Sequence, residues 1–582
     1  MKVSSGRSKR TPGQSCRPGL TEWVFCMFFS VTLACVAAVL SFRSLLHIQE
    51  EKYRPGFLEA STSITEAPTE PPVEAVLVFD SAMPGMLPKA VWHSKASQAV
   101  VPPLPPNTAG IEGLVQRTQV TTSAPNCEVL LPDLANRLAK DLHSAQEQRN
   151  LDLAVQAWKG LLSGKIQVDY MRQRLCSRME AWFKSLTTMS WQSPRGVTSV
   201  LVWPQAAYLH FGVKRVWSLG EYTQWADLCA ALATLGLEVK LWPFQKKSFP
   251  TLSIYESFNA VYTDYNGVHA GKGVGARPPP DKTWLLDTFG TDGTVVANDF
   301  FGRIPPLTDY PLHRFLTLVP GYSSRNTFLG VAAVAGSTEA STLPERRWQC
   351  VLWSKVHPWL AESNGFPAYH WKLLREYTKY CKVIATVDIK DTYKTAELIR
   401  TCCPAVEIRE VQSPKAFQEL IRGSAVYVGV GEPLIAPSCF EALSLGTHVV
   451  QPRFPEPRML KNKPITQNWT SQHPFLEQIP EPYAFTIDPL NFEALGATFR
   501  ALRNAFDSVY GEADTPLTAR ESKAMRNFYL SGDYPGREEF SISGFLKRVA
   551  GTVTKTRTLE AADWDWERGD HPQQLPARAF QS

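Results

Sequence analysis

The residues whose types and spacing could do chemistry are concentrated in residues 428–443, VGVGEPLIAPSCFEAL. An apolar run typical of a strand ends at two near-adjacent glycines, Gly429 and Gly431, and a loop containing Pro433 leads into a predicted helix. Glycine lets the backbone approach a ligand closely, and the free N–H groups at a helix N-terminus bind phosphate. Glu441 falls in the first helical turn, where its carboxylate could accept hydrogen bonds from both ribose hydroxyls. The segment therefore predicts a nucleotide diphosphate site.

A structural alternative explains part of the same segment without a ligand. Ser438 and Glu441 have the Ser-x-x-Glu spacing of a capping box, in which each side chain satisfies a backbone N–H group of the other residue. A Gly-x-Gly sequence alone is also a weak signal. On these residues alone, helix capping and nucleotide binding both remain open.

Cationic side chains follow other predicted strands and could neutralise a diphosphate. Lys355 follows one predicted strand, and Arg453, Lys461 and Lys463 follow another. Ligands of parallel α/β sheets lie at the carboxyl ends of the strands, which favours a functional role for these side chains. Each of them alone is equally typical of a solvated surface charge.

The elements that must position these residues form two alternating series of short apolar runs and amphipathic stretches. Such alternation indicates parallel sheets covered by helices. The first series predicts strands at residues 199–203, 237–242, 260–263 and 284–287 and a helix at 222–235. The second predicts strands at 350–353, 382–386, 425–430 and 448–451 and helices at 369–381, 414–422, 440–445 and 492–506. We therefore predict an α/β fold with two doubly wound, Rossmann-like domains, 197–345 and 346–510, that face a cleft.

The N-terminal part predicts a membrane anchor. Residues 23–42 are an uncharged, mostly apolar run, and about 20 helical residues span a bilayer core. Residues 1–22 are rich in Lys and Arg, which predicts a cytoplasmic tail. The alternative is a cleaved signal peptide, but the apolar run is longer than a usual signal core and no clean A-x-A cleavage site follows it. A Pro-rich stem (43–125), a helical region (126–196) and a C-terminal helix and tail (511–582) complete the predicted organisation.

Composition excludes some partners and sites. The net charge of +6 is spread over 582 residues, so nucleic acid is not an implied partner. A lumenal compartment would permit disulfides, although pairing cannot be read from the sequence and the adjacency of Cys402 and Cys403 disfavours a bridge between them. No Cys/His cluster has the spacing of a zinc site, so no metal site is predicted. One N-glycosylation sequon begins at Asn468.

Residues 198–550 resemble the N-acetylglucosaminyltransferase V family. The glycine-rich segment matches the family's GxGxPxxxPxxxEAxxxG pattern from Gly429 to Gly446. Residues 470–475, TSQHPF, resemble its T-S-Q-H-P-[YF] block, which is unusual enough to be highly specific. Further similar segments, in the family's order, are GEYTQWADL (220–228), LDTFGT (286–291), NTFLG (326–330), QPRF (451–454) and the segment 539–549.

The resemblance implies a GT-B fold, UDP-N-acetylglucosamine (UDP-GlcNAc) as donor and no metal cofactor. The implied reaction inverts the anomeric configuration and adds GlcNAc in β-1,6 linkage to the α-1,6-linked mannose of an N-glycan. The family places a Glu directly after its L-D-S-F-G-T segment, and Asp292 stands at that position here. A carboxylate suits the general base that the reaction needs. Asp287 is a competing candidate for the base, or else a structural residue that fixes the loop.

Other site residues are carried over from the same resemblance. Arg453 matches a family Lys and Lys355 resembles the Lys of a G-K-V segment, so both are expected near the diphosphate. Glu221 and Trp225 are candidates for the acceptor side, although the position of Trp225 on an amphipathic helix is more typical of a core residue. The family also implies a single-pass type II protein of the Golgi membrane with a lumenal catalytic part.

Two further motifs are set aside, and two alternatives remain. Residues 267–273, GVHAGKG, are one residue too short for a P-loop and lack its Ser or Thr, and the Asp563-Trp564-Asp565 sequence lies outside the resemblance. The family's Trp-containing segment after the catalytic loop has no clear counterpart between residues 295 and 325. A GT-B glycosyltransferase with another acceptor or sugar, or a glycan-binding Golgi pseudoenzyme, are therefore the alternatives.

Overall fold

The structure, a computed structural model, describes a set of segments that all lie in one compact unit, Pro105–Ser582. The described segments are 127–164, 166–192, 197–211, 220–243, 249–273, 277–288, 307, 309–318, 326–333, 342–353, 369–387, 393–410, 413–458, 469–511 and 517–555. The predicted tail (1–22), anchor (23–42) and stem (43–125) lie outside them. Among the helices within these segments, none combines the length and the apolarity that crossing a membrane requires.

The first sheet has the strand order β2-β1-β3-β4-β5-β6, and all its described pairings are parallel. Its strands are β1 (Ser199–Trp203), β2 (Glu238–Leu241), β3 (Ala260–Thr263), β4 (Thr283–Leu286), β5 (Phe315–Thr317) and β6 (Thr327–Phe328). The helices between them are α5 (Gln205–Phe211), α6 (Gly220–Thr234), α7 (Leu252–Glu256) and α8 (Tyr265–Gly273). Helix α6 is buried along nearly its whole length, because other helices cover the side that faces away from the sheet.

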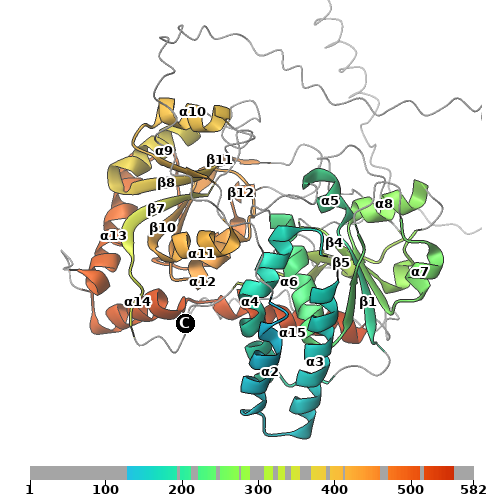
Figure 1. The fold of residues 1–582 in the computed structure, drawn as a ribbon. Coiled ribbons are helices and arrows are strands. Elements are labelled where there is room, and N and C mark those ends of the chain that lie inside the picture. Colours follow the sequence, from blue (N-terminus) through green and yellow to red (C-terminus); the bar gives the residue numbers. More distant parts are fainter. Residues whose placement is uncertain are drawn as a thin grey trace, which may run out of the picture. The chain divides into compact units, whose positions relative to one another are not determined.

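The second sheet has the order β12-β11-β10-β7-β8-β9, with β13 also paired to β11. Its strands are β7 (Arg347–Trp353), β8 (Lys382–Val387), β9 (Glu407–Glu410), β10 (Ser424–Gly429), β11 (His448–Arg458), β12 (Trp469–Ser471) and β13 (Ala484–Ile487). Only the β11–β12 pairing is antiparallel among those described. The helices are α9 (Tyr369–Tyr380), α10 (Tyr393–Cys402), α11 (Pro414–Arg422), α12 (Ser438–Ser444), α13 (Phe492–Tyr510) and α14 (Ala519–Ser531). In Figure 1, α9 and α13 lie on one side of this sheet and α11 and α12 on the other.

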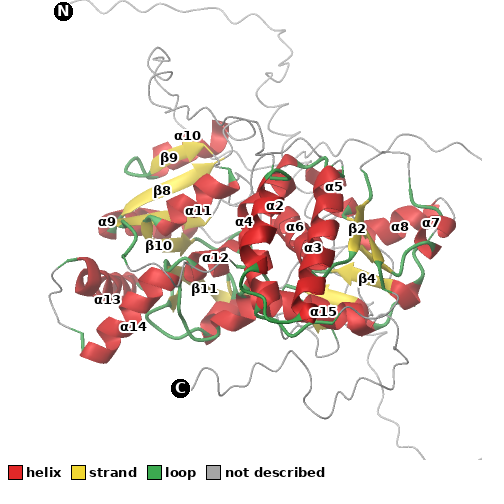
Figure 2. Cartoon of the chain, turned by 60° about the horizontal axis from the view of Figure 1, so that its bottom comes forward, coloured by secondary structure: helices red, strands yellow, loops and turns green. Residues whose placement is uncertain are grey.

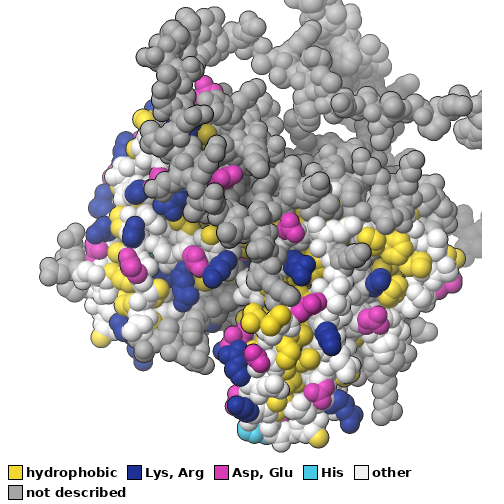
Figure 3. Space-filling model, in the orientation of Figure 1, with side chains coloured by type: hydrophobic (Ala, Val, Ile, Leu, Met, Phe, Trp, Pro, Cys, Tyr) yellow, Lys and Arg dark blue, Asp and Glu magenta, His cyan; other side chains and the backbone are white. Residues whose placement is uncertain are grey.

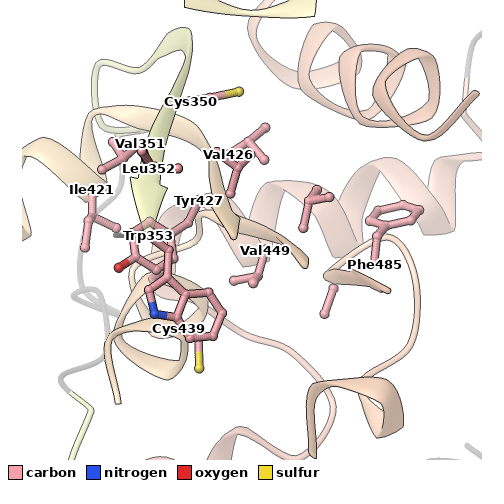
Figure 4. Close-up of a cluster of buried hydrophobic side chains, with 14 of the residues drawn as sticks. Cys350, Val351, Leu352, Trp353, Ile421, Val426, Tyr427, Cys439, Val449 and Phe485 are labelled. Carbon is pink, nitrogen blue, oxygen red and sulfur yellow. The ribbon is translucent and has the colours of Figure 1, made fainter. Parts of the chain in front are cut away.

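The predicted α/β class with two parallel sheets is confirmed. The central strands of the second sheet are continuous apolar runs, as expected for strands covered on both faces. Figure 4 shows side chains from β7, β10 and β11 meeting in this core, with the Trp353 ring stacked on Tyr427 at a centroid distance of 5.7 Å.

Three helices precede the first sheet and one helix returns to it from the C-terminus. The first three are α2 (Leu130–Ala139), α3 (Ala145–Ser163) and α4 (Asp169–Thr187), and the last is α15 (Ile542–Lys555). Helix α15 packs against α4 and α6 (Figure 2). Phe545, Leu546 and Val549 of α15 are buried in one core with Trp182 of α4 and Trp225 of α6. The helical region and the C-terminal helix therefore belong to the core of the first sheet.

Disulfides join neighbouring elements in three places among the described residues. Cys127 is bonded to Cys176 of α4, and Cys350 of β7 is bonded to Cys381 after α9. Cys402 and Cys403 are bonded to each other, so the expectation that their adjacency disfavours a bridge is wrong. Helix α10 ends at Cys402, so this bond joins the last residue of the helix to the residue that follows it.

Candidate functional site

The glycine-rich loop begins where β10 ends, as the sequence predicts. The Gly429 carbonyl accepts a hydrogen bond from the Tyr377 hydroxyl at 2.9 Å. A Cβ atom at Gly429 would lie 2.2 Å from Gln472 Oε1 and 3.2 Å from the Trp353 ring, so a larger residue does not fit. Gly431 has a φ of +116°, a conformation that glycine adopts readily and other residues rarely do. Both glycines are thus required by the local geometry.

Gln472 fixes the conformation of this loop. Its side chain is fully buried, its Oε1 accepts from the Gly431 N–H at 2.8 Å, and its Nε2 donates to the Pro433 carbonyl at 3.1 Å. Its backbone carbonyl accepts from the Ile435 N–H at 3.1 Å. Gln472 belongs to the TSQHPF block, so the sequence marked the segment as important but gave no role for this side chain.

Helix α12 begins at Ser438 without a capping box. Its N-cap residue, Pro437, makes no side-chain capping bond, and the Ser438 hydroxyl is paired instead with the Tyr427 hydroxyl at 2.9 Å. The capping-box interpretation of Ser438 and Glu441 is therefore wrong. The Glu441 carboxylate has stronger partners elsewhere, because it forms ion pairs with two arginines.

These ion pairs form a buried cluster of four charged side chains. Glu441 Oε1 lies 2.7 Å from Arg174 Nη2 and 2.5 Å from Arg178 Nη2, both on α4. Arg174 also donates through Nε and Nη2 to both oxygens of Asp227 on α6, at 2.8 and 2.7 Å. Each of the four residues is at most 6% exposed. Such charges are stable in a protein interior only when they are paired, as they are here.

The pKa values of the cluster follow from these contacts. Burial alone raises the pKa of the Glu441 carboxyl, but the Arg174 and Arg178 guanidinium groups lower it to about 2. Burial lowers the pKa of Arg174, but Asp227 and Glu441 raise it well above its usual value. Glu441 is therefore a carboxylate and Arg174 a cation throughout the physiological pH range.

The start of α6 lies beside the start of α12, and the carboxyl end of β4 lies beside α6. The Thr288 hydroxyl, next to Asp287, donates to Gln224 Oε1 of α6 at 3.3 Å. The position of a Cβ at Gly220, where α6 begins, is 3.3 Å from Pro437 Cδ. Segments that resemble the acceptor side and the donor side of the family site are thus brought together, although they lie on different sheets.

The acceptor-side candidates differ in their surroundings. Asp287 is 3% exposed, and its Oδ2 accepts from the Tyr265 hydroxyl at 2.6 Å. Glu221 is exposed in the first turn of α6. Trp225 is 2% exposed and packs in the core with α4 and α15, as its helical position suggested.

Of the predicted cationic side chains, Arg453 lies within the described residues. Its side chain on β11 is 57% exposed, and its Nη2 lies 3.5 Å from Glu477 Oε2. Asp292, Lys355 and the sequon residue Asn468 lie outside the described residues, as do Lys461 and Lys463.

His473 is a buried polar residue of the same region whose role sequence reasoning missed. Its backbone N–H donates to Gln451 Oε1 at 2.7 Å, and its ring packs edge-on against Phe440 at 5.0 Å. Burial lowers the pKa of His473 to about 3, so the ring is neutral. Neither ring nitrogen has a hydrogen-bond partner among the described residues. The described part of the chain contains no group of three or more His, Cys, Asp or Glu side chains arranged to hold a metal ion.

The sequence of this chain is similar to those of known glycosyltransferases. The sequence profile of glycosyltransferase family 18 matches residues 120–508. The chain is 26% identical over 319 residues to alpha-1,6-mannosylglycoprotein 6-beta-N-acetylglucosaminyltransferase B of Mus musculus, covering 49% of this chain and 38% of that protein. It is 25% identical over 390 residues to the corresponding enzyme A of Rattus norvegicus, covering 59% and 50%.

The coverage of the other matches is also partial. A Caenorhabditis elegans alpha-1,6-mannosylglycoprotein 6-beta-N-acetylglucosaminyltransferase is 23% identical over 316 residues, covering 47% of this chain and 44% of that protein. The chain thus spans half or less of the length of these relatives. Among solved structures, the avilamycin glycosyltransferase AviGT4 is similar at 12% identity with a TM-score of 0.35, covering 62% of this chain and 97% of that one. Because the family profile extends from the helices before the first sheet to the second sheet, the chain belongs to glycosyltransferase family 18.

Proposed function

We propose that this chain is an inverting GT-B glycosyltransferase that transfers GlcNAc from UDP-GlcNAc to an N-glycan. The acceptor would be the 6-hydroxyl of the α-1,6-linked mannose, and the product linkage would be β-1,6. The observation that carries the proposal is the approach of the start of α6 to the start of α12 beside the glycine-rich loop, with Thr288, the neighbour of Asp287, hydrogen-bonded to α6. The names of the relatives supply the sugar and the acceptor.

In this proposal the second sheet binds the donor. The backbone N–H groups at the start of α12, which follows the glycine-rich loop, would bind the diphosphate. Glu441 accepts from the ribose. Arg453 and Lys355 supply positive charge to the diphosphate as it leaves. No metal ion is required, because these cations and the helix N-terminus perform the neutralisation.

The general base of the proposal is Asp292. It would take the proton of the attacking mannose hydroxyl, which it must reach within about 3 Å. Asp287 is the competing candidate. Its carboxylate already accepts from Tyr265, which favours a structural role in fixing the end of β4. Glu221, exposed at the start of α6, would contact the acceptor glycan.

Variants of the two aspartates test this assignment. Asp292→Asn keeps size and polarity but cannot accept a proton, so kcat should fall by about 10²- to 10⁴-fold while UDP affinity stays unchanged. Asp292→Glu should keep measurable activity, because the family uses Glu at this position. Near wild-type activity of Asp292→Asn together with an inactive Asp287→Asn variant would move the base to Asp287.

Metal independence has its own test. Transfer should continue in the presence of EDTA. Complete loss of activity that divalent metal restores would contradict the proposed neutralisation by Arg453, Lys355 and α12.

The location of the protein belongs to the proposal as well. Residues 23–42 would anchor it as a type II protein of the Golgi membrane, with residues 1–22 in the cytosol. Protease added to intact Golgi vesicles should then remove an N-terminal tag and spare a C-terminal tag. The opposite pattern would refute this topology.

A further inference from the structure

The two oxygens of the Glu441 carboxylate are not equivalent. Both arginine contacts end on Oε1, at 2.7 Å from Arg174 and 2.5 Å from Arg178. The hydrogen bonds and ion pairs described for the Glu441 side chain all end on Oε1, and the side chain keeps 8% of its surface exposed. One oxygen is thus occupied by the protein, and the other remains able to accept a hydrogen bond from a ligand.

The arginines are themselves held from several sides. Arg174 donates to both oxygens of Asp227, a two-bond geometry that fixes the plane of the guanidinium group. Arg178 donates through Nη1 to the Ala332 carbonyl at 2.5 Å. With the Gln418 amide oriented so that its oxygen faces Arg178, that oxygen accepts from Nη2 at 2.5 Å. The direction of the Glu441 side chain is therefore set by α4 and α6 together.

We propose that Arg174 and Arg178 are positioning residues for nucleotide recognition, which hold Glu441 through Oε1 so that Oε2 accepts from a ribose hydroxyl of the donor. This inference rests on the proposed function, and it extends the site to a helix that precedes the first sheet. Helix α4 would then act in donor binding although it lies far from the glycine-rich loop in sequence. No motif in the sequence indicated such a role for either arginine.

The charges around Glu441 predict how the site responds to pH. Arg174 and Arg178 face it from α4, Asp227 lies beyond them on α6, and Tyr427 and Cys439 are the other titratable groups close to it. The two arginines lower the pKa of Glu441 to about 2, and burial opposes them. Removing one arginine should raise this pKa, so that Glu441 becomes protonated as the pH falls.

The experiment compares the binding of UDP and of 2′,3′-dideoxy-UDP to the full chain by calorimetry between pH 5 and pH 8. The wild type should bind UDP about tenfold or more tightly than the dideoxy analogue, because the analogue cannot donate to Oε2. This preference should be independent of pH. In Arg178→Met it should shrink to less than about threefold, and what remains should weaken as the pH falls.

Two further variants keep the test decisive. Arg178→Lys keeps the charge but not the planar geometry, so the preference should fall without becoming dependent on pH. Lys184→Met removes a charge from an exposed position of the same helix and should leave the preference unchanged. Arg174→Lys serves where Arg178→Met does not fold, with the same result expected as for Arg178→Lys.

An equal loss of affinity for both nucleotides in the Arg178 variants, or no loss for either, would overturn the positioning role. A wild type that binds both nucleotides equally would also overturn it, because Glu441 would then not read the ribose. Transfer of GlcNAc by that same wild type would show that the proposed function survives, so the two failures are distinguishable.

Discussion

At the scale of single residues, Glu441 links ligand affinity to stability. An exposed carboxylate could bind a ligand without affecting the stability of the protein. The Glu441 carboxylate instead neutralises two arginines that are each 2% exposed. Removing one partner of a buried ion pair leaves the other charge uncompensated, which costs about 3–5 kcal/mol. The same side chain therefore serves the protein interior through one oxygen and, in our proposal, the donor through the other.

Glu441→Gln should consequently affect two measurements. The free energy of unfolding in urea should fall by about 3–5 kcal/mol, and the dissociation constant of UDP should rise by about tenfold or more. The matched control is Glu477→Gln, whose partner Arg453 is 57% exposed, so that its pair contributes less than about 1 kcal/mol. Unchanged stability of Glu441→Gln would contradict the buried cluster, and unchanged UDP affinity would remove Glu441 from the donor site.

At the scale of elements, the conformation of the loop after β10 depends on Gln472, which follows the distant strand β12 in the sequence. Gln472 follows β12, yet its side chain bonds to the backbone of Gly431 and Pro433 and fills the space beside Gly429. The loop conformation is thus a property of two segments and not of the glycines alone.

A double-mutant cycle tests this dependence. Gly429→Ala should destabilise the protein by about 1–3 kcal/mol, because the new Cβ would meet Gln472 Oε1 at 2.2 Å. Gln472→Ala should cost about 1–3 kcal/mol, because it leaves the buried Gly431 N–H unpaired. In the double variant the clash with Gln472 is gone, so the combined cost should be smaller than the sum by at least about 0.5 kcal/mol. Strict additivity in urea unfolding would show that the two residues do not interact.

Local patterns were sufficient to predict the central strands of both sheets and several of the helices. The helix predicted at residues 414–422 is α11 with the same bounds, because a Pro at its first position and a Gly after its last residue mark both ends. The buried strands were visible as apolar runs. The contacts that shape the site were not predictable. Arg178 and Glu441 are separated by 263 positions, and the local sequence of neither helix indicates that it contacts the other. The same holds for Gln472 and the glycine-rich loop.

At the scale of the whole described molecule, helices that precede the first sheet and a helix that follows the second sheet complete the core of the first sheet. Helices α3 and α4 and the returning helix α15 cover α6, so the first sheet has its core only when segments from both sides are present. Figure 3 shows Lys and Arg side chains interspersed with Asp and Glu on the described part of one face. The absence of a nucleic acid partner stays a prediction.

Stability should depend on pH through buried histidines. His448 joins β11 to α14, with Nε2 2.7 Å from the Tyr529 hydroxyl, and burial lowers its pKa to about 3. Its ordinary pKa of 6.5 in the unfolded chain means that the unfolded state binds the proton first as the pH falls. The contribution of neutral His448 is therefore complete above about pH 6.5 and is lost progressively toward pH 3.

His448→Gln should make the pH dependence of unfolding shallower. Between pH 6 and pH 4.5 the slope of the unfolding free energy should differ from that of the wild type by about one proton, or about 1.4 kcal/mol per pH unit. Other groups, such as Asp264, whose pKa burial raises to about 7, change the unfolding free energy with pH in the opposite direction. Their effect is the same in both proteins, so it cancels when the slope of the variant is subtracted from that of the wild type. Parallel curves for the two proteins would mean that His448 titrates normally in the folded state.

The central claim concerns the reaction itself, and one assay addresses it most directly. Residues 43–582, expressed as a secreted protein, are incubated with UDP-GlcNAc and a biantennary N-glycan whose α-1,6-linked mannose has a free 6-hydroxyl. The account predicts a product heavier by one GlcNAc, with a β-1,6 linkage to that mannose by NMR, and about 10²- to 10⁴-fold slower formation of this product by Asp292→Asn under the same conditions. A product with another linkage or sugar, or no product from a wild-type protein that still binds the glycan, would contradict it.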